Sequence, residues 1–148
     1  MTDTKRELLE QDDKGWADLR SLIDDLTPEQ ANEPGYNGEW SVKDLIAHIG
    51  SWFAEAGVML EQMRMGTYTR ERLDVDGLNK TWFETWRDKD MNTVKSELMS
   101  ARSRMLEEWD RLPEVDDEAK RWFYESTAEH YEEHLPRLRD WVAQVRGT

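Results

Sequence analysis

Apolar residues recur every three or four positions along most of this chain, which is the spacing of amphipathic helices. Four long segments show the pattern, at about residues 3–26, 41–65, 92–112 and 118–146, and a shorter one lies at about 76–89. Runs of alternating β-branched residues, which predict strands, are nearly absent from the sequence. The pattern therefore predicts an all-α fold of four long helices, with a short helix between the second and the third.

Residues that start helices support these segments. Thr27 with Gln30, and Ser41 with Asp44, have the spacing of capping boxes, in which each side chain bonds to the backbone of the other residue. The first pair predicts a short helical turn after the first long helix. The second pair predicts the start of the second long helix.

Two prolines and one long connection shape the expected topology. Pro113 predicts the end of the third long helix, and Pro136 lies inside the last one, where we expect it to kink or loosen the helix. A connection of about 25 residues joins the second and third long helices, which lets these two helices run parallel. We therefore expect an up-down-down-up four-helix bundle whose crossover carries the short helix.

Length and charge bound the class of protein. The chain has 148 residues, the size of one domain, and we expect residues 1–148 to form a single bundle. Its net charge is −13 and its basic residues are interspersed with acidic ones, so no basic patch offers a site for nucleic acid or anionic lipid. No segment approaches the roughly 20 apolar residues of a membrane span, and the N-terminal residues lack the apolar region of a signal peptide. We expect a cytoplasmic protein without a nucleic-acid or membrane partner.

The three histidines of the chain are its strongest chemical signal. His48 lies in the second long segment, and His130 and His134 stand one helical turn apart in the last one. Residues four apart share one face of a helix, and all three positions fall on the apolar sides of their segments. Because the chain has no cysteine, any metal ligands are nitrogen and oxygen atoms. We predict that the three imidazoles bind one divalent transition metal ion, such as Zn, Ni or Fe; the alternative is three hydrogen-bonded core histidines.

Three imidazole ligands would leave coordination positions open for water or substrate, as catalytic metal sites require. The favoured hypothesis is a metal-dependent hydrolase or thiol-group transferase that acts on a small electrophile or xenobiotic. Asp44, Glu129 and Glu133 are close enough in sequence to bond to the other ring nitrogens of the histidines, or else they face solvent.

Four of the eight tryptophans, Trp52, Trp82, Trp86 and Trp122, allow two interpretations. They wall a cavity beside the histidines, or they are ordinary core residues at helical spacing, which is the commoner case.

Two segments carry a resemblance to a known family. Residues 40–49, Trp-Ser-Val-Lys-Asp-Leu-Ile-Ala-His-Ile, and residues 127–134, Thr-Ala-Glu-His-Tyr-Glu-Glu-His, resemble the DinB-like superfamily of four-helix bundles. The resemblance implies an up-down-down-up bundle, a homodimer, and a divalent metal ion on His48, His130 and His134.

Within that superfamily, the crossover at residues 74–79 and the segment at residues 134–141 are similar to the ClbS/DfsB branch. That branch includes a colibactin-resistance protein that opens a cyclopropane. The resemblance implies a second hypothesis, a resistance or binding protein that captures a toxic small molecule, or opens its cyclopropane, without metal. A third is a dimeric protein whose metal ion is structural.

Overall fold

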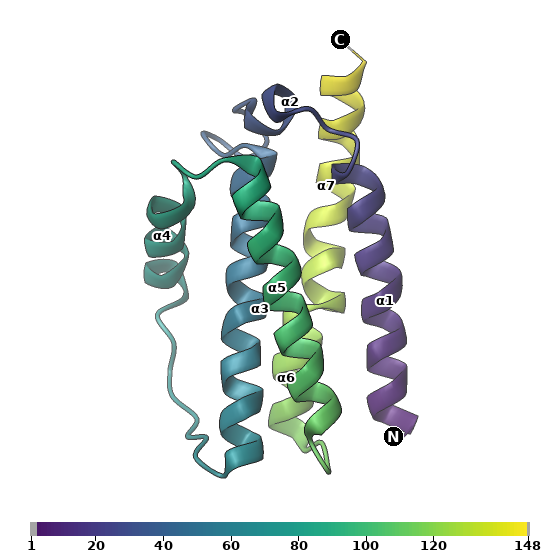
Figure 1. The fold of residues 1–148 in the computed structure, drawn as a ribbon, viewed down its shortest axis with the longest axis vertical. Coiled ribbons are helices and arrows are strands. Elements are labelled where there is room, and N and C mark those ends of the chain that lie inside the picture. The colour runs from purple at the N-terminus through teal and green to yellow at the C-terminus, as the bar shows by residue number, and fades with distance from the viewer. Residues whose placement is uncertain (1–2, 148) are drawn as a thin grey trace.

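The computed structural model describes residues 3–147, and most of them lie in helices (Figure 1). In chain order the helices are α1 (Asp3–Ile23), α2 (Pro28–Asn32), α3 (Val42–Met65), α4 (Val75–Trp86), α5 (Met91–Arg111), α6 (Asp117–Ser126) and α7 (Ala128–Arg146). Residues 3–147 contain no strand, only one isolated bridge between Asn37 and Trp40. The structure confirms the predicted all-α fold.

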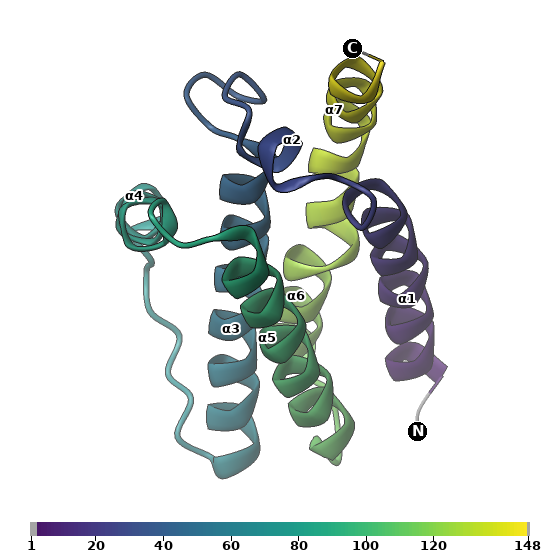
Figure 2. The ribbon, with the colours of Figure 1, turned by 45° about the horizontal axis from the view of Figure 1, so that its top comes forward.

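The long helices have the predicted up-down-down-up order. In Figure 1, α1 rises from the N-terminal end, α3 and α5 both descend, and α6 and α7 rise again toward the C-terminus. Helices α3 and α5 run side by side and parallel in both views, because residues 66–90 return the chain to the upper end (Figure 2). Among residues 3–147, no helix has both the length and the apolar composition needed to cross a membrane.

The predicted start and stop signals place the helix ends. The Ser41 side chain accepts a hydrogen bond from the Asp44 backbone, and the Asp44 carboxylate accepts one from the Ser41 backbone, so the capping box opens α3. The other predicted capping box opens α2. Helix α3 ends at Gly66 with φ of 74°, a left-handed conformation that glycine adopts without strain. Helix α5 ends at Arg111. The next residue, Leu112, is extended, as expected because the proline that follows it disfavours the helical conformation.

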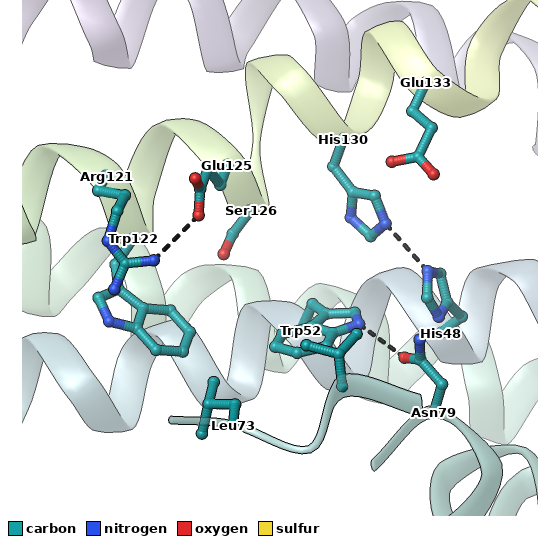
Figure 3. A pocket seen from close by; sticks show the side chains of 11 residues that line it. His48, Trp52, Leu73, Asn79, Arg121, Trp122, Glu125, Ser126, His130 and Glu133 are labelled. Atoms are coloured by element: carbon teal, nitrogen blue, oxygen red, sulfur yellow. Dashed lines mark hydrogen bonds and ion pairs between the residues drawn. The ribbon is translucent and has the colours of Figure 1, made fainter. Parts of the chain in front are cut away.

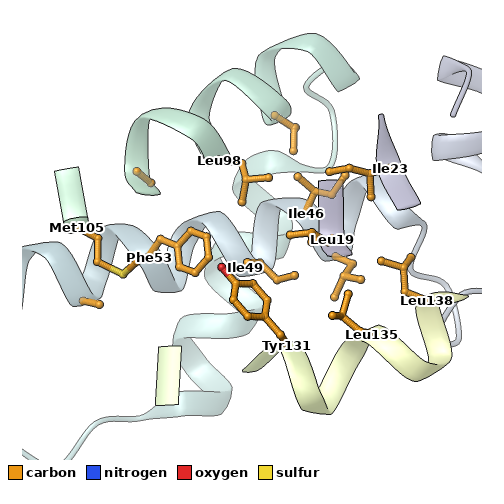
Figure 4. Close-up of a cluster of buried hydrophobic side chains, with 14 of the residues drawn as sticks. Leu19, Ile23, Ile46, Ile49, Phe53, Leu98, Met105, Tyr131, Leu135 and Leu138 are labelled. Carbon is orange, nitrogen blue, oxygen red and sulfur yellow. The ribbon is translucent and has the colours of Figure 1, made fainter. Parts of the chain in front are cut away.

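Apolar side chains from four helices meet in one core (Figure 4). The fully or almost fully buried members include Leu19 and Ile23 of α1, Ile46, Ile49 and Phe53 of α3, Leu98 and Met105 of α5, and Leu135 and Leu138 of α7. Burial of apolar area on this scale is the main term that stabilises the bundle. The core fixes how the faces of α3 and α7 that carry the histidines oppose each other.

The prediction of one continuous last helix was wrong. The chain is interrupted at Thr127, which has φ of −112° and ψ of −96° and separates α6 from α7. The hydroxyl of Thr127 donates to the Phe123 carbonyl at 2.7 Å, a side-chain bond that competes with the helical backbone pattern. Pro136 does lie inside α7, but the helix continues through it. The interruption lets α6 pack on α3 while α7 packs mainly on α1.

The crossover helix α4 lies outside the bundle and has no buried residue. Its C-terminal end is held by Lys43 of α3, whose ammonium donates to the carbonyls of Arg87 and Lys89 at 2.7 and 2.5 Å. The Phe83 ring stacks on Trp40 with 5.5 Å between ring centroids. Polar and aromatic contacts therefore attach α4, together with the partly buried Trp86, which packs against the core.

Candidate metal centre

The three histidines, far apart in sequence, come together in the bundle. Helix α3 carries His48, and α7 carries His130 and His134 one turn apart. His48 Nε2 lies 3.0 Å from His130 Nε2 (Figure 3), and the ring centroids of the three side chains are 4.7 to 5.3 Å apart. Each ring offers one nitrogen such that the three nitrogens lie within 4.8 Å of one another. The structure therefore brings His48, His130 and His134 together, as the sequence predicted.

The surroundings keep the imidazoles uncharged. Burial lowers the pKa of His48 to about 4, with the neighbouring His134 adding to the effect. Burial also lowers the pKa of His130 well below its usual range, and His48 and His134 act in the same direction. The pKa of His134 is lowered by burial, which the Glu133 carboxylate opposes. A neutral imidazole carries a free lone pair on one nitrogen, the form in which histidine binds metal.

The donor set fits a divalent transition metal. His134 Nε2 is buried and has no hydrogen-bond partner among residues 3–147, an arrangement that costs free energy unless something else satisfies the nitrogen. Two nitrogens bound to one Zn²⁺ at about 2.1 Å lie about 3.4 Å apart in tetrahedral geometry. His48 Nε2 and His130 Nε2 are 3.0 Å apart, so these two rings would separate by a few tenths of an ångström to hold the ion. Neutral nitrogen ligands suit Zn, Ni and Fe much better than Mg or Ca.

Groups that the sequence did not single out lie near the three rings, although His48 Nδ1 and His130 Nδ1 have no hydrogen-bond partner among residues 3–147. The Tyr36 hydroxyl is 3.5 Å from His134 Nδ1. The Asn79 side chain of α4 lies against the His48 ring (Figure 3) and raises the pKa of that histidine, while the Ser126 carbonyl raises the pKa of His130; both effects are smaller than that of burial. Partners at the second ring nitrogen orient metal-binding histidines in general.

The three acidic residues predicted as possible partners of the histidines lie in different surroundings. The Asp44 carboxylate bonds to Ser41 at the start of α3, so its role is to cap the helix. Glu129 is exposed. Glu133 lines the cavity beside the histidines, and its carboxylate points toward His130 and His48 in Figure 3.

A cavity of about 280 Å³ opens next to the histidines. Its lining includes the indoles of Trp52 and Trp122, the side chains of His48 and His130, and Asn79. Of the other two candidate tryptophans, Trp82 packs edge-on against Trp52 at 4.9 Å and Trp86 packs on the core; neither lines this cavity. Two of the four tryptophans that could wall the cavity, Trp52 and Trp122, therefore line it.

Arg121 is the one cationic side chain in the lining of this cavity, within the described part of the chain. Its guanidinium donates to Glu118 at 3.1 Å and to Glu125 at 3.1 Å, and it lies over the Trp122 ring. Because two carboxylates balance its charge, Arg121 does not present an unpaired cation to an anionic ligand.

The topology and the histidine cluster define a class: a small up-down-down-up helical bundle with a potential three-histidine metal centre at a cavity between helices. The chain matches the model of the DinB superfamily over residues 11–145. It belongs to the DinB superfamily.

Comparison with solved structures agrees on the fold. An uncharacterised protein from Escherichia coli UTI89 aligns with a TM-score of 0.79, covering 99% of this chain and 96% of its own, at 19% sequence identity. At that identity the likeness concerns the fold alone. No curated protein matches the chain.

Proposed function

We propose that this protein is a metal-dependent enzyme, a hydrolase or thiol-group transferase that acts on a small electrophile or xenobiotic. One observation carries the proposal: one ring nitrogen from each of the three histidines lies within 4.8 Å of the other two, and two of these residues, His48 and His130, line a cavity. Closed structural sites use four protein ligands, whereas three leave room for a reactant.

His48, His130 and His134 would hold the ion, because they supply the three converging nitrogens. A divalent ion bound there supplies Lewis acidity, which lowers the pKa of a bound nucleophile and polarises a carbonyl or leaving group. The helices α3 and α7 hold the ligands on regular helical backbone.

Glu133 is the residue best placed to move a proton. It lines the cavity together with His130, is exposed to solvent, and forms no ion pair with any described residue. One of its carboxylate oxygens would accept the proton that a water or thiol nucleophile gives up. The indoles of Trp52 and Trp122 would pack against the apolar part of the substrate.

Metal content tests the proposal. The protein is purified without an affinity tag, loaded with Zn²⁺, desalted and submitted to elemental analysis. We expect close to one ion per chain in the wild type and almost none in His130→Ala or His48→Ala. Glu129→Ala is the matched control on the exposed face of α7 and should load fully. Full occupancy in His130→Ala would refute the assignment.

A second candidate is the ClbS/DfsB-like resistance or binding protein without metal. It is favoured by the contact between His48 Nε2 and His130 Nε2, because two neutral imidazoles of opposite tautomer form a hydrogen bond at 3.0 Å without an ion. Under this hypothesis, chelator-treated protein keeps its ligand affinity and its melting temperature. Under the enzyme hypothesis, chelation lowers the melting temperature and abolishes turnover.

A further inference from the structure

Tyr36 lies in the loop between α2 and α3, where it is buried and bonded through both its backbone and its side-chain surroundings. Its side chain and backbone together are 2% exposed. Its backbone N–H donates to the Trp40 carbonyl at 2.9 Å, and its own carbonyl accepts from Arg137 Nε at 2.6 Å. The Arg137 guanidinium also lies over the Tyr36 ring at 5.5 Å. The phenol is therefore fixed in place before any ligand arrives.

The fixed phenol faces one histidine of the cluster. The Tyr36 hydroxyl oxygen lies 3.5 Å from His134 Nδ1, the outer limit of hydrogen-bond contact. The other ring nitrogen, His134 Nε2, is buried without a hydrogen-bond partner in the described chain. The two nitrogens of this ring thus have different surroundings, and the neutral ring carries its proton on only one of them.

The location of that proton decides whether His134 can bind metal. If Nδ1 carries it, Nδ1–H can donate to the Tyr36 oxygen and Nε2 keeps a free lone pair. If Nε2 carries it, a buried N–H is left without an acceptor, which costs about 1–3 kcal/mol. The geometry therefore favours the proton on Nδ1.

We propose that Tyr36 is a positioning residue of the candidate metal centre. Its hydroxyl oxygen accepts the Nδ1–H of His134 and so directs the lone pair of Nε2 toward His48 and His130. This inference rests on the proposed function, because it concerns the same three ligands. It assigns the loop at residues 33–41 a role in the site beyond joining α2 to α3.

Two measurements test this role. Long-range ¹H–¹⁵N spectra of the full chain, treated with chelator, report which nitrogen of His134 carries the proton. We expect protonation on Nδ1 in the wild type and a mixture of tautomers in Tyr36→Phe. Zn²⁺ affinity, measured by competition with a chromophoric chelator, should be about 10- to 100-fold weaker in Tyr36→Phe.

Tyr68→Phe is the matched control. Its hydroxyl donates to Glu118 at 2.7 Å and contacts no histidine, so its removal should leave both the His134 tautomer and the Zn²⁺ affinity unchanged. Protonation of His134 on Nε2 in the wild type, or equal Zn²⁺ affinity in Tyr36→Phe and wild type, would overturn the inference. Failure of the wild type to bind Zn²⁺ would instead overturn the proposed function, and the tautomer measurement on metal-free protein would still decide the role of Tyr36.

Discussion

His48 and His130 are ligand candidates whose charge is controlled by burial. No carboxylate is paired with either ring in the described chain, and the helix core around them disfavours the protonated form. Metal ions compete with protons for an ordinary histidine near neutral pH. These two rings are already unprotonated there, so the site is ready to bind an ion without first losing a proton.

The same burial predicts how stability depends on pH. The folded pKa of His48, about 4, lies below the unfolded value of 6.5, so the unfolded chain takes up the proton first as the pH falls. The free energy of unfolding is therefore highest above pH 6.5 and decreases as the pH falls toward 4. Urea unfolding of chelator-treated protein at pH 7 and pH 5 should show a loss of about 1–2 kcal/mol from His48.

His130 and His134, whose pKa values burial also lowers, and the carboxylates of the chain contribute in this range, so the effect of His48 is isolated by difference. His48→Gln cannot take up this proton and should lose less stability between pH 7 and pH 5 than the wild type. Equal losses in the two proteins would contradict the buried, neutral state of His48.

At the scale of elements, α1 and α7 meet through a close contact and a buried polar network. A Cβ added at Gly15 would come within 2.1 Å of the Tyr131 ring. The Tyr131 hydroxyl donates to the fully buried Asp12 carboxylate at 2.8 Å, and Arg102 of α5 donates to the same carboxylate at 2.7 Å. Tyr131 follows His130 directly in α7, so this packing also fixes the helix that carries two of the three histidines.

Gly15→Ala should therefore destabilise the fold by about 1–3 kcal/mol, because the new methyl group forces the Tyr131 ring to move. The matched control is Gly57→Ala in α3, where the nearest atom to a new Cβ is 3.5 Å away. There the better helix propensity of alanine should leave stability unchanged or raise it by up to about 1 kcal/mol. Chemical denaturation measures both. A Gly15→Ala protein as stable as the wild type would show that α1 is not packed on Tyr131 as described.

At the scale of the molecule, the features that depend on local sequence signals were predictable. The apolar periodicity and the capping box at Ser41 predicted the helices, and the length of the crossover predicted that the second and third long helices run parallel. The interruption at Thr127 was not predictable from periodicity, since the apolar pattern runs through it and a threonine inside a helix is common. Of the site, the His130 and His134 pair followed from helical spacing. Tyr36 was missed because its contact spans 98 residues of sequence.

Metal binding should stabilise the whole bundle, because the three candidate ligands come from two helices, α3 and α7, that are far apart in sequence. Zn²⁺ at about 100 times its dissociation constant would raise the free energy of unfolding by about 2.7 kcal/mol. Thermal unfolding with and without Zn²⁺ measures this gain, which His130→Ala should abolish. The same gain in His130→Ala would mean that the ion binds elsewhere, for example on the acidic surface.

The crossover helix α4 combines two properties with a consequence for the cavity. It has no buried residue, yet Val75 and Asn79 line the cavity at the histidines. Mutations in this segment can alter the shape and polarity of that cavity while the core that keeps the bundle folded stays intact. Changes at the exposed positions of α4 and at Asn79 can therefore alter which compounds fit the cavity, while the histidines and the core stay as they are.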